Sequence, residues 1–225
     1  MLEKICEGVW SAPSPLAVLG MIKLNTRMTV VRMRDGGIWL HSPVAINDEL
    51  RKRVSQLGEV RYIVAPSCFH HMFVLPWKEA FPNADVYIAR GLHKKRKDLA
   101  YAGIFEGQAI WPEFAQQTIK GMPSLNEELF FHHDSQTLIT TDFLFYMPQT
   151  TGFTGMYAWL NGFKQRVMTP IIFRAAIKNK REFLESLQNI RGWIPKTISM
   201  CHHYIYTEDA QGAFQQALNR LGVPE

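Results

Sequence analysis

The 225-residue chain has little cysteine and no long hydrophobic run. Its cysteines, Cys6, Cys68 and Cys201, are odd in number and widely spaced, which indicates reduced thiols and not a disulfide framework. No apolar stretch reaches the ~18 residues that a membrane-spanning helix needs, and the N-terminus has no apolar signal core. We therefore expect a cytoplasmic protein without a membrane partner.

The motifs that commonly bind phosphates or activate a serine are missing too. Neither GxGxxG nor GxxxxGK[ST] occurs, and Ser67 lacks the glycines of a nucleophile elbow. The net charge of +5 is modest, and the one dense basic cluster, residues 93–97, has no interleaved aromatic residues. We interpret this cluster as a solvated loop and expect no nucleic-acid partner.

What is present is typical of one layered α/β domain spanning residues 1–225. The composition, 47% hydrophobic and 20% charged, suits a sizeable core, and no repeat or linker interrupts it. Strand patterns alternate with amphipathic helix patterns, which favours layered α/β structure. The strands are expected at 28–34, 38–40, 62–64, 85–89, 128–133, 137–141 and 197–201, and helices at 47–57, 75–81, 179–190 and 210–221. Residues 8–22 are interpreted as loop-rich, and residues 146–170, rich in glycine and aromatics, as a cover over the core or over a pocket.

Six of the eight histidines occur as three adjacent pairs, and each pair closes a run that is typical of a strand. The pairs are His70-His71, His132-His133 and His202-His203. Asp142 follows a further strand, and strand ends in α/β proteins are where loops converge on a site. Imidazole and carboxylate groups are the usual ligands of zinc, iron and manganese. Because neighbouring side chains of an extended backbone point to opposite faces, each pair should send one imidazole to a common site unless the backbone turns between the two.

The order of these elements resembles the metallo-β-lactamase fold superfamily, and more narrowly a divergent branch catalogued as a domain of unknown function. IWLHSP resembles that fold's early strand, which commonly ends in Asp, and His41 stands at that place. YIVAPSCFHHMF resembles the strand and loop that carry a His-x-His-x-Asp-His motif. LITTDFLF resembles the segment with the metal-bridging Asp, and ISMCHH the last strand with the final ligand. The resemblance spans nearly the whole chain and implies a four-layer αββα sandwich of the α/β class.

The resemblance implies metal ligands at Asp142 and His202, together with His70 or His71. His71 matches the last histidine of the motif and His70 its aspartate. The other two histidine places of the motif hold Pro66 and Cys68.

The histidine that the family carries before its second hairpin is not found near residues 121–124. A full two-metal site is therefore not expected, which leaves one metal or none. His132 and His133 are interpreted as hairpin residues, and the role of His41 stays open.

Three hypotheses for the function follow. The first is a metal-dependent hydrolase in which a metal-bound hydroxide, formed because the metal lowers the pKa of water to ~7, attacks a small ester, thioester or lactone. His71, Asp142 and His202 would hold zinc, iron or manganese, His70 or Asp142 would orient or deprotonate the water, and the aromatic segment 146–163 would shape the pocket. The alternative is a degenerate member of the fold that binds no metal and acts in binding or structure. Oxygen or redox chemistry at a single iron is a third hypothesis. The substrate, the metal and the oligomeric state do not follow from the sequence.

Overall fold

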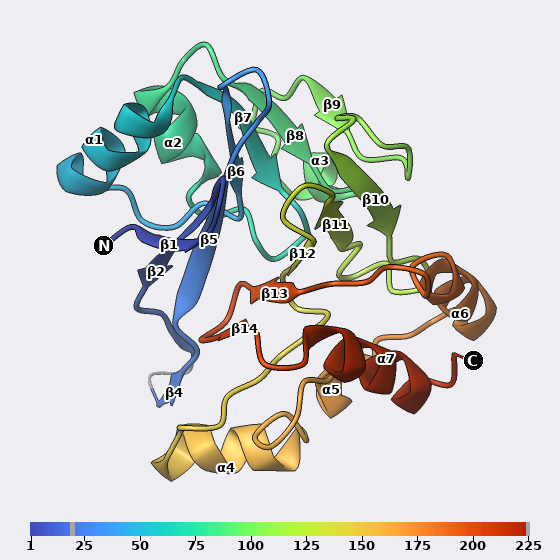
Figure 1. Ribbon diagram of the computed structural model, residues 1–225. Coiled ribbons are helices and arrows are strands. Elements are labelled where there is room, and N and C mark those ends of the chain that lie inside the picture. Colours follow the sequence, from blue (N-terminus) through green and yellow to red (C-terminus); the bar gives the residue numbers. More distant parts are fainter. Residues whose placement is uncertain (19–20, 224–225) are drawn as a thin grey trace.

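The computed structural model describes residues 1–18 and 21–223, and most of its strands form two large sheets (Figure 1). The first sheet has the order β1-β2-β5-β6-β7-β8-β9. Its strands are β1 (Glu3–Cys6), β2 (Val9–Ser14), β5 (Thr26–Arg32), β6 (Ile38–His41), β7 (Val60–Ala65), β8 (Asp85–Ile88) and β9 (Gly103–Ile104). Neighbours are antiparallel up to β6, and β6 to β9 run parallel.

The second sheet has the order β10-β11-β12-β13-β14. Its strands are β10 (Phe114–Thr118), β11 (Glu128–His132), β12 (Thr137–Thr140), β13 (Thr197–Met200) and β14 (Ile205–Tyr206). Only β12 and β13 are parallel neighbours. A separate two-stranded ribbon joins β3 (Ala17–Val18) to β4 (Ile22–Lys23).

The inner faces of the two sheets pack on each other through an aromatic cluster. Alternation along β6 sends Trp39 inward, whereas Ile38 and Leu40 face the helices on the other side. The Trp39 ring lies 5.0 Å from that of Phe130 on β11 and 4.6 Å from that of Phe114 on β10. These side chains are almost fully buried and form the core between the sheets.

Helices cover the outer face of each sheet, so the order of layers is αββα. α1 (Asp48–Leu57) and α2 (Val74–Ala80) pack on the first sheet, and α6 (Lys180–Gln188) and α7 (Ala210–Arg220) pack on the second. Figure 1 shows the first pair at the upper left and the second pair at the right, with the strands between them. The predicted four-layer sandwich is confirmed.

The helix predictions hold because their end signals are local. Asn47 begins α1 by accepting a hydrogen bond from the Leu50 amide at 2.8 Å, and Asn179 caps α6 in the same way.

The expectation of loop structure at 8–22 is wrong for the described residues, since β2 pairs on both sides with β1 and β5; residues 19–20 lie outside the described chain. The segment 146–170 contains a helix, α4 (Gly152–Leu160).

No helix in residues 1–18 and 21–223 combines the length and the apolar character that crossing a bilayer requires.

We expect Phe130→Ala to lower the free energy of unfolding by about 3–5 kcal/mol, because the truncation leaves a cavity between the two sheets. Chemical denaturation measures this change. Tyr101→Ala, which removes a side chain that is 44% exposed, is the control and should have a far smaller effect. Equal effects of the two substitutions would contradict the assignment of Phe130 to the core.

Candidate metal site

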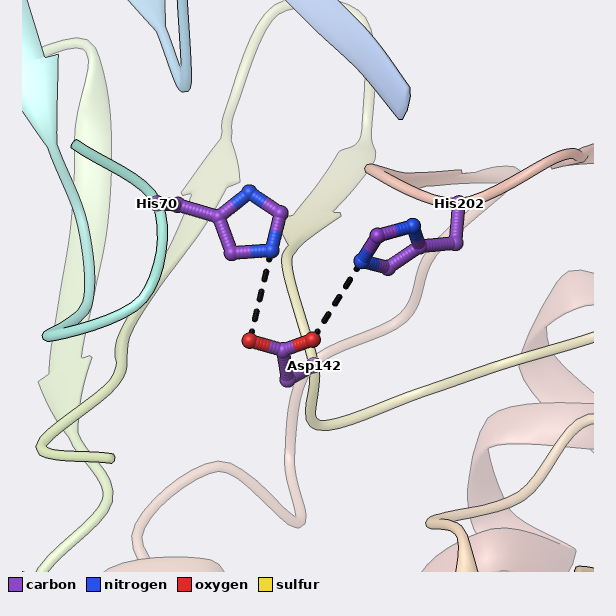
Figure 2. A group of neighbouring side chains, drawn as sticks. All are labelled: His70, Asp142 and His202. Atoms are coloured by element: carbon purple, nitrogen blue, oxygen red, sulfur yellow. Dashed lines mark ion pairs between the residues drawn. The ribbon is translucent and has the colours of Figure 1, made fainter. Parts of the chain in front are cut away.

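Three of the four predicted ligands, His70, Asp142 and His202, come together at one edge of the sandwich (Figure 2). Asp142 Oδ2 lies 3.3 Å from His70 Nε2, and Asp142 Oδ1 lies 3.3 Å from His202 Nε2. One donor atom from each residue lies within 4.8 Å of the other two. The side chains are only 10%, 6% and 5% exposed, in the order named, so the cluster is largely shielded from water.

Parallel strand pairs bring these residues together. β12 and β13 are in register with Thr140 opposite Met200, so the loops carrying Asp142 and His202 leave the second sheet side by side. His70 follows β7 in the first sheet. A β-bridge between Thr26 and His202 joins the two sheets at this edge.

The loop that carries His70 is ordered by its own serine. Buried Ser67 accepts hydrogen bonds from the amides of Phe69 and His70 at 3.3 and 3.1 Å, as short Ser turns do. The Cys68 amide donates to the Leu125 carbonyl at 2.9 Å. The basic cluster contributes as well, since Lys95 Nζ donates to the Cys68 carbonyl at 2.9 Å. The loop therefore holds His70 in one place.

His202 is held by the backbone of the opposite sheet. Its Nδ1 lies 2.9 Å from the Leu24 carbonyl and 3.3 Å from that of Asn25. A carbonyl only accepts, so Nδ1 carries the proton. The ring also stacks on Phe145 at 4.8 Å between centroids. In a neutral imidazole the Nε2 lone pair then faces Asp142, and this repulsive arrangement calls for a cation between them or a proton on Nε2.

Ser42, at the end of β6, orients His70. Its Oγ lies 2.7 Å from His70 Nδ1, and its amide donates to the Val64 carbonyl at 3.0 Å. Ser42 has φ of +53°, a left-handed conformation that costs a non-glycine residue roughly 1 kcal/mol. Strain of this kind concentrates at functional sites. Ser42 thus leaves His70 Nε2 directed at Asp142.

Asp142 is anchored by a buried carboxyl group that no sequence pattern indicated. Glu127 Oε1 accepts from the Thr141 amide at 2.6 Å, and Oε2 accepts from the Asp142 amide at 2.9 Å. Glu127 is fully buried. Its position directly before a strand, in a region without a clear pattern, gave no signal in the sequence.

The electrostatics make Asp142 the single negative charge of the cluster at neutral pH. Burial alone raises the pKa of Asp142, but the His70 and His202 imidazoles outweigh it and hold that pKa well below its usual range. Burial and the nearby Asp142 charge raise the pKa of Glu127 to about 8. Burial lowers the pKa of His202, yet Asp142 and the two carbonyls raise it on balance. One carboxylate therefore faces two imidazoles.

The donor set fits a divalent metal. Asp142 Oδ2 is buried and has no hydrogen-bond partner among the described residues, although His70 Nε2 is near it. Ligand atoms ~2.0–2.2 Å from a tetrahedral zinc are ~3.3–3.6 Å apart, and each imidazole Nε2 lies 3.3 Å from one oxygen of Asp142, His70 from Oδ2 and His202 from Oδ1. Two imidazoles and a carboxylate suit zinc or iron.

His71 does not join this group, which corrects the expectation that His71 would be the preferred ligand. Its Nδ1 accepts from Arg96 Nη1 at 2.9 Å. Burial, with Lys95 and Arg96 nearby, lowers its pKa to about 4. His203 has φ of +58° and directs Nε2 to the Lys23 carbonyl. Each of these two pairs thus sends one imidazole to the cluster, although the backbone at both pairs is turned and not extended.

The remaining histidines have other surroundings. His132, at the end of β11, places Nδ1 2.7 Å from Ser135 Oγ in the hairpin turn. His41 is fully buried, stacks on Trp39 at 5.5 Å, and has no partner for Nε2 among the described residues. Burial, and to a smaller extent the nearby His70, keep the pKa of His41 well below its ordinary value. His41 is therefore a neutral ring.

The cluster opens into a pocket of about 360 Å³, a size that suits a small ligand. Apolar side chains make up most of its wall, with the polar groups gathered around the cluster. The apolar lining includes Leu16, Leu24, Phe69, Met72, Phe73, Tyr157 and Phe173. Tyr157 belongs to α4, so part of the aromatic segment does reach the pocket. Tyr146 instead packs against Tyr204 and Tyr206.

We expect Glu127→Ala to speed hydrogen exchange at the Thr141 and Asp142 amides and to destabilise the fold by about 1–3 kcal/mol for each amide left unpaired. Glu127→Gln should have a smaller effect, because its amide oxygen keeps one acceptor. Glu182→Ala, at an exposed position, is the control. Unchanged exchange at both amides would contradict the anchoring role of Glu127.

Comparisons with known proteins agree with this architecture. Residues 7–102 match the family model described as Domain of unknown function (DUF4336). No curated protein matches the chain.

Among solved structures, a metallo-beta-lactamase from Pontibacter korlensis is 10% identical, with a TM-score of 0.68 and coverage of 100% of this chain and 99% of that one. TMB-1 is 13% identical, with a TM-score of 0.68 and coverage of 99% and 98%. DIM-1 metallo-beta-lactamase is 12% identical, with a TM-score of 0.66 and coverage of 98% and 96%. The chain therefore has the metallo-β-lactamase fold, as the resemblance in the sequence implies.

Proposed function

We propose that the protein is a metal-dependent hydrolase of a small ester, thioester or lactone, with one divalent metal held by His70, Asp142 and His202. The observation that carries this proposal is the buried Asp142 carboxylate, which has an unpaired oxygen and faces two imidazoles at the bottom of an apolar pocket. Zinc is the metal that we expect first, because the donor set and its spacing suit it.

When bound, the metal would polarise a carbonyl and lower the pKa of water to ~7. The chain supplies the orientation. The Leu24 carbonyl fixes the proton of His202 on Nδ1, so Nε2 of His202 presents a lone pair to the site. Ser42 fixes the ring of His70, and His70 Nε2 would ligate the metal with the Ser42 hydroxyl accepting from Nδ1. Asp142 offers two oxygens, one as a ligand and one to accept a proton from the attacking water. The apolar wall binds the hydrocarbon part of the substrate and excludes bulk water.

The alternative function, binding or structure without a metal, has its own supporting observation. With His202 protonated on Nε2, Asp142 and His202 form a buried ion pair, which is consistent with the raised pKa of His202 and the lowered pKa of Asp142. Among the described residues only three donors gather here, and Pro66 and Cys68 stand where the resemblance implies two further ligands. Metal analysis separates the two functions.

We expect the untagged protein to contain close to one equivalent of zinc, iron or manganese per chain, measured by mass spectrometry after incubation with each ion. Asp142→Ala and His202→Ala should each abolish stoichiometric binding, because two ligands do not retain the ion. His71→Ala is the matched control, since it removes the neighbouring imidazole of the same loop and should leave metal content unchanged.

Metal in none of these samples would overturn the proposal and leave the binding or structural function. Hydrolysis of ester, thioester and lactone panels by the loaded protein, lost in Asp142→Ala and retained in His71→Ala, would support it. Loss of metal in His71→Ala alone would instead assign the site to a different set of residues.

We expect Ser42→Ala to weaken metal affinity by about 10–100-fold, the usual cost of removing the group that orients a ligating imidazole. Competition with a chromophoric chelator measures this affinity. Ser55→Ala, on the exposed side of α1, is the control. An unchanged affinity in Ser42→Ala would show that the Ser42 hydroxyl does not orient His70.

A further inference from the structure

The second unusual feature of the molecule is an apolar outer surface on α4 and the neighbouring α5 (Ile171–Arg174). Six of the thirteen large apolar side chains that are exposed among the described residues lie on these two short helices. They are Phe153, Met156, Trp159, Leu160, Ile171 and Ile172, between 50% and 65% exposed, and together we call them the α4–α5 face. Exposed apolar residues are ordinary when scattered, but a contiguous group of this kind marks an interaction site.

The two helices are joined firmly, so the group is one surface. Asn161, at the end of α4, accepts from the Ile171 amide through its carbonyl at 3.3 Å and from the Ile172 amide through its side chain at 3.2 Å. The opposite side of α4 presents Thr154, Gly155 and Ala158 to the protein. Figure 1 shows α4 at the lower edge, away from both sheets.

The chain segment that carries this face has charge of a single sign. Residues 143–181 hold six of the 25 basic residues and none of the 20 acidic ones, so the rest of the chain is close to neutral. Residues 8–34, which include the adjoining β3–β4 ribbon, also contain no acid. Lys164 and Arg166 lie between the two helices, and neither forms an ion pair with any residue in 1–18 or 21–223. The face therefore combines exposed apolar anchors with unpaired cations.

We propose that the α4–α5 face docks the protein onto an anionic membrane surface. Apolar and aromatic side chains that enter the headgroup region, flanked by Lys and Arg that attract anionic lipids, are the features of interfacial binding. α4 is nine residues long, or ~13.5 Å, so it lies on the bilayer and does not cross it. The expectation of no membrane partner rested on the lack of a membrane-spanning hydrophobic stretch. That observation does not test binding to the surface of a membrane.

Charge favours a membrane over a second copy of the chain. A two-fold dimer places one patch against itself, so Lys164 and Arg166 would face their own equivalents. An anionic lipid surface neutralises them instead.

The docked face lies beside the 360 Å³ pocket, whose wall shares Tyr157 with α4 and Phe173 with α5, so docking brings the pocket mouth near the lipid.

Flotation with vesicles tests the proposal, using phosphatidylcholine alone or mixed with phosphatidylserine. We expect the protein to bind only the mixed vesicles, with binding reduced by added salt. Phe153→Ser with Trp159→Ser, and separately Lys164→Glu with Arg166→Glu, should each weaken binding by about tenfold or more. The matched controls are Ile194→Ser and Lys52→Glu with Lys97→Glu, which change exposed residues elsewhere and should bind as the unmodified protein does.

Circular dichroism and the melting temperature should be the same in all variants, because the changed side chains are exposed or, for Lys164, half-buried. Absence of binding to mixed vesicles, or equal binding by face and control variants, would overturn the proposal. A dimer in sedimentation that Phe153→Ser with Trp159→Ser dissociates, without vesicle binding, would assign the face to self-association and also overturn it. None of these readouts depends on metal or hydrolysis.

Discussion

The arrangement of the site depends on one buried negative charge. Burying an unpaired carboxylate costs several kcal/mol, so the surrounding structure must supply compensation. Two imidazoles, each fixed by a partner on its far nitrogen, face Asp142, and Glu127 holds the backbone that carries it. A protonated His202 satisfies one oxygen of Asp142, and a bound divalent cation would neutralise the charge of the carboxylate. The arrangement of Asp142 between two imidazoles is thus compatible with a stable metal-free protein and with a site that binds a metal.

The fold produces this arrangement by aligning strand ends. Ser42 and His70 follow two parallel neighbours in the first sheet, and Asp142 and His202 follow the parallel pair of the second. The hydrogen bond at 2.8 Å between Thr29 Oγ1 and Ser199 Oγ, with the bridge at Thr26, holds the two sheets at this edge. The core around Trp39 sets the spacing between the sheets. Packing far from the cluster therefore decides whether the ligands meet.

The segment between β12 and α6 gives the molecule its other distinctive surface. Among its inward side chains, Phe145 stacks on His202, and Phe163 packs against Phe145. Its outward side chains form the α4–α5 face. One stretch of chain therefore contributes both to the pocket wall and to the exposed apolar α4–α5 face with its basic flanks.

The sequence by itself determined the fold class, the ends of most helices and the candidate residues. These are local properties, since a cap such as Asn47 or an alternating strand needs only its neighbours, and the order of elements identified the resemblance. Only the tertiary structure decided between His70 and His71, because that depends on a loop turned by Ser67 and on Arg96, 25 residues further along the chain. It also revealed Glu127 and Ser42. Their roles arise from contacts with residues 14 to 28 positions away, which no local pattern encodes.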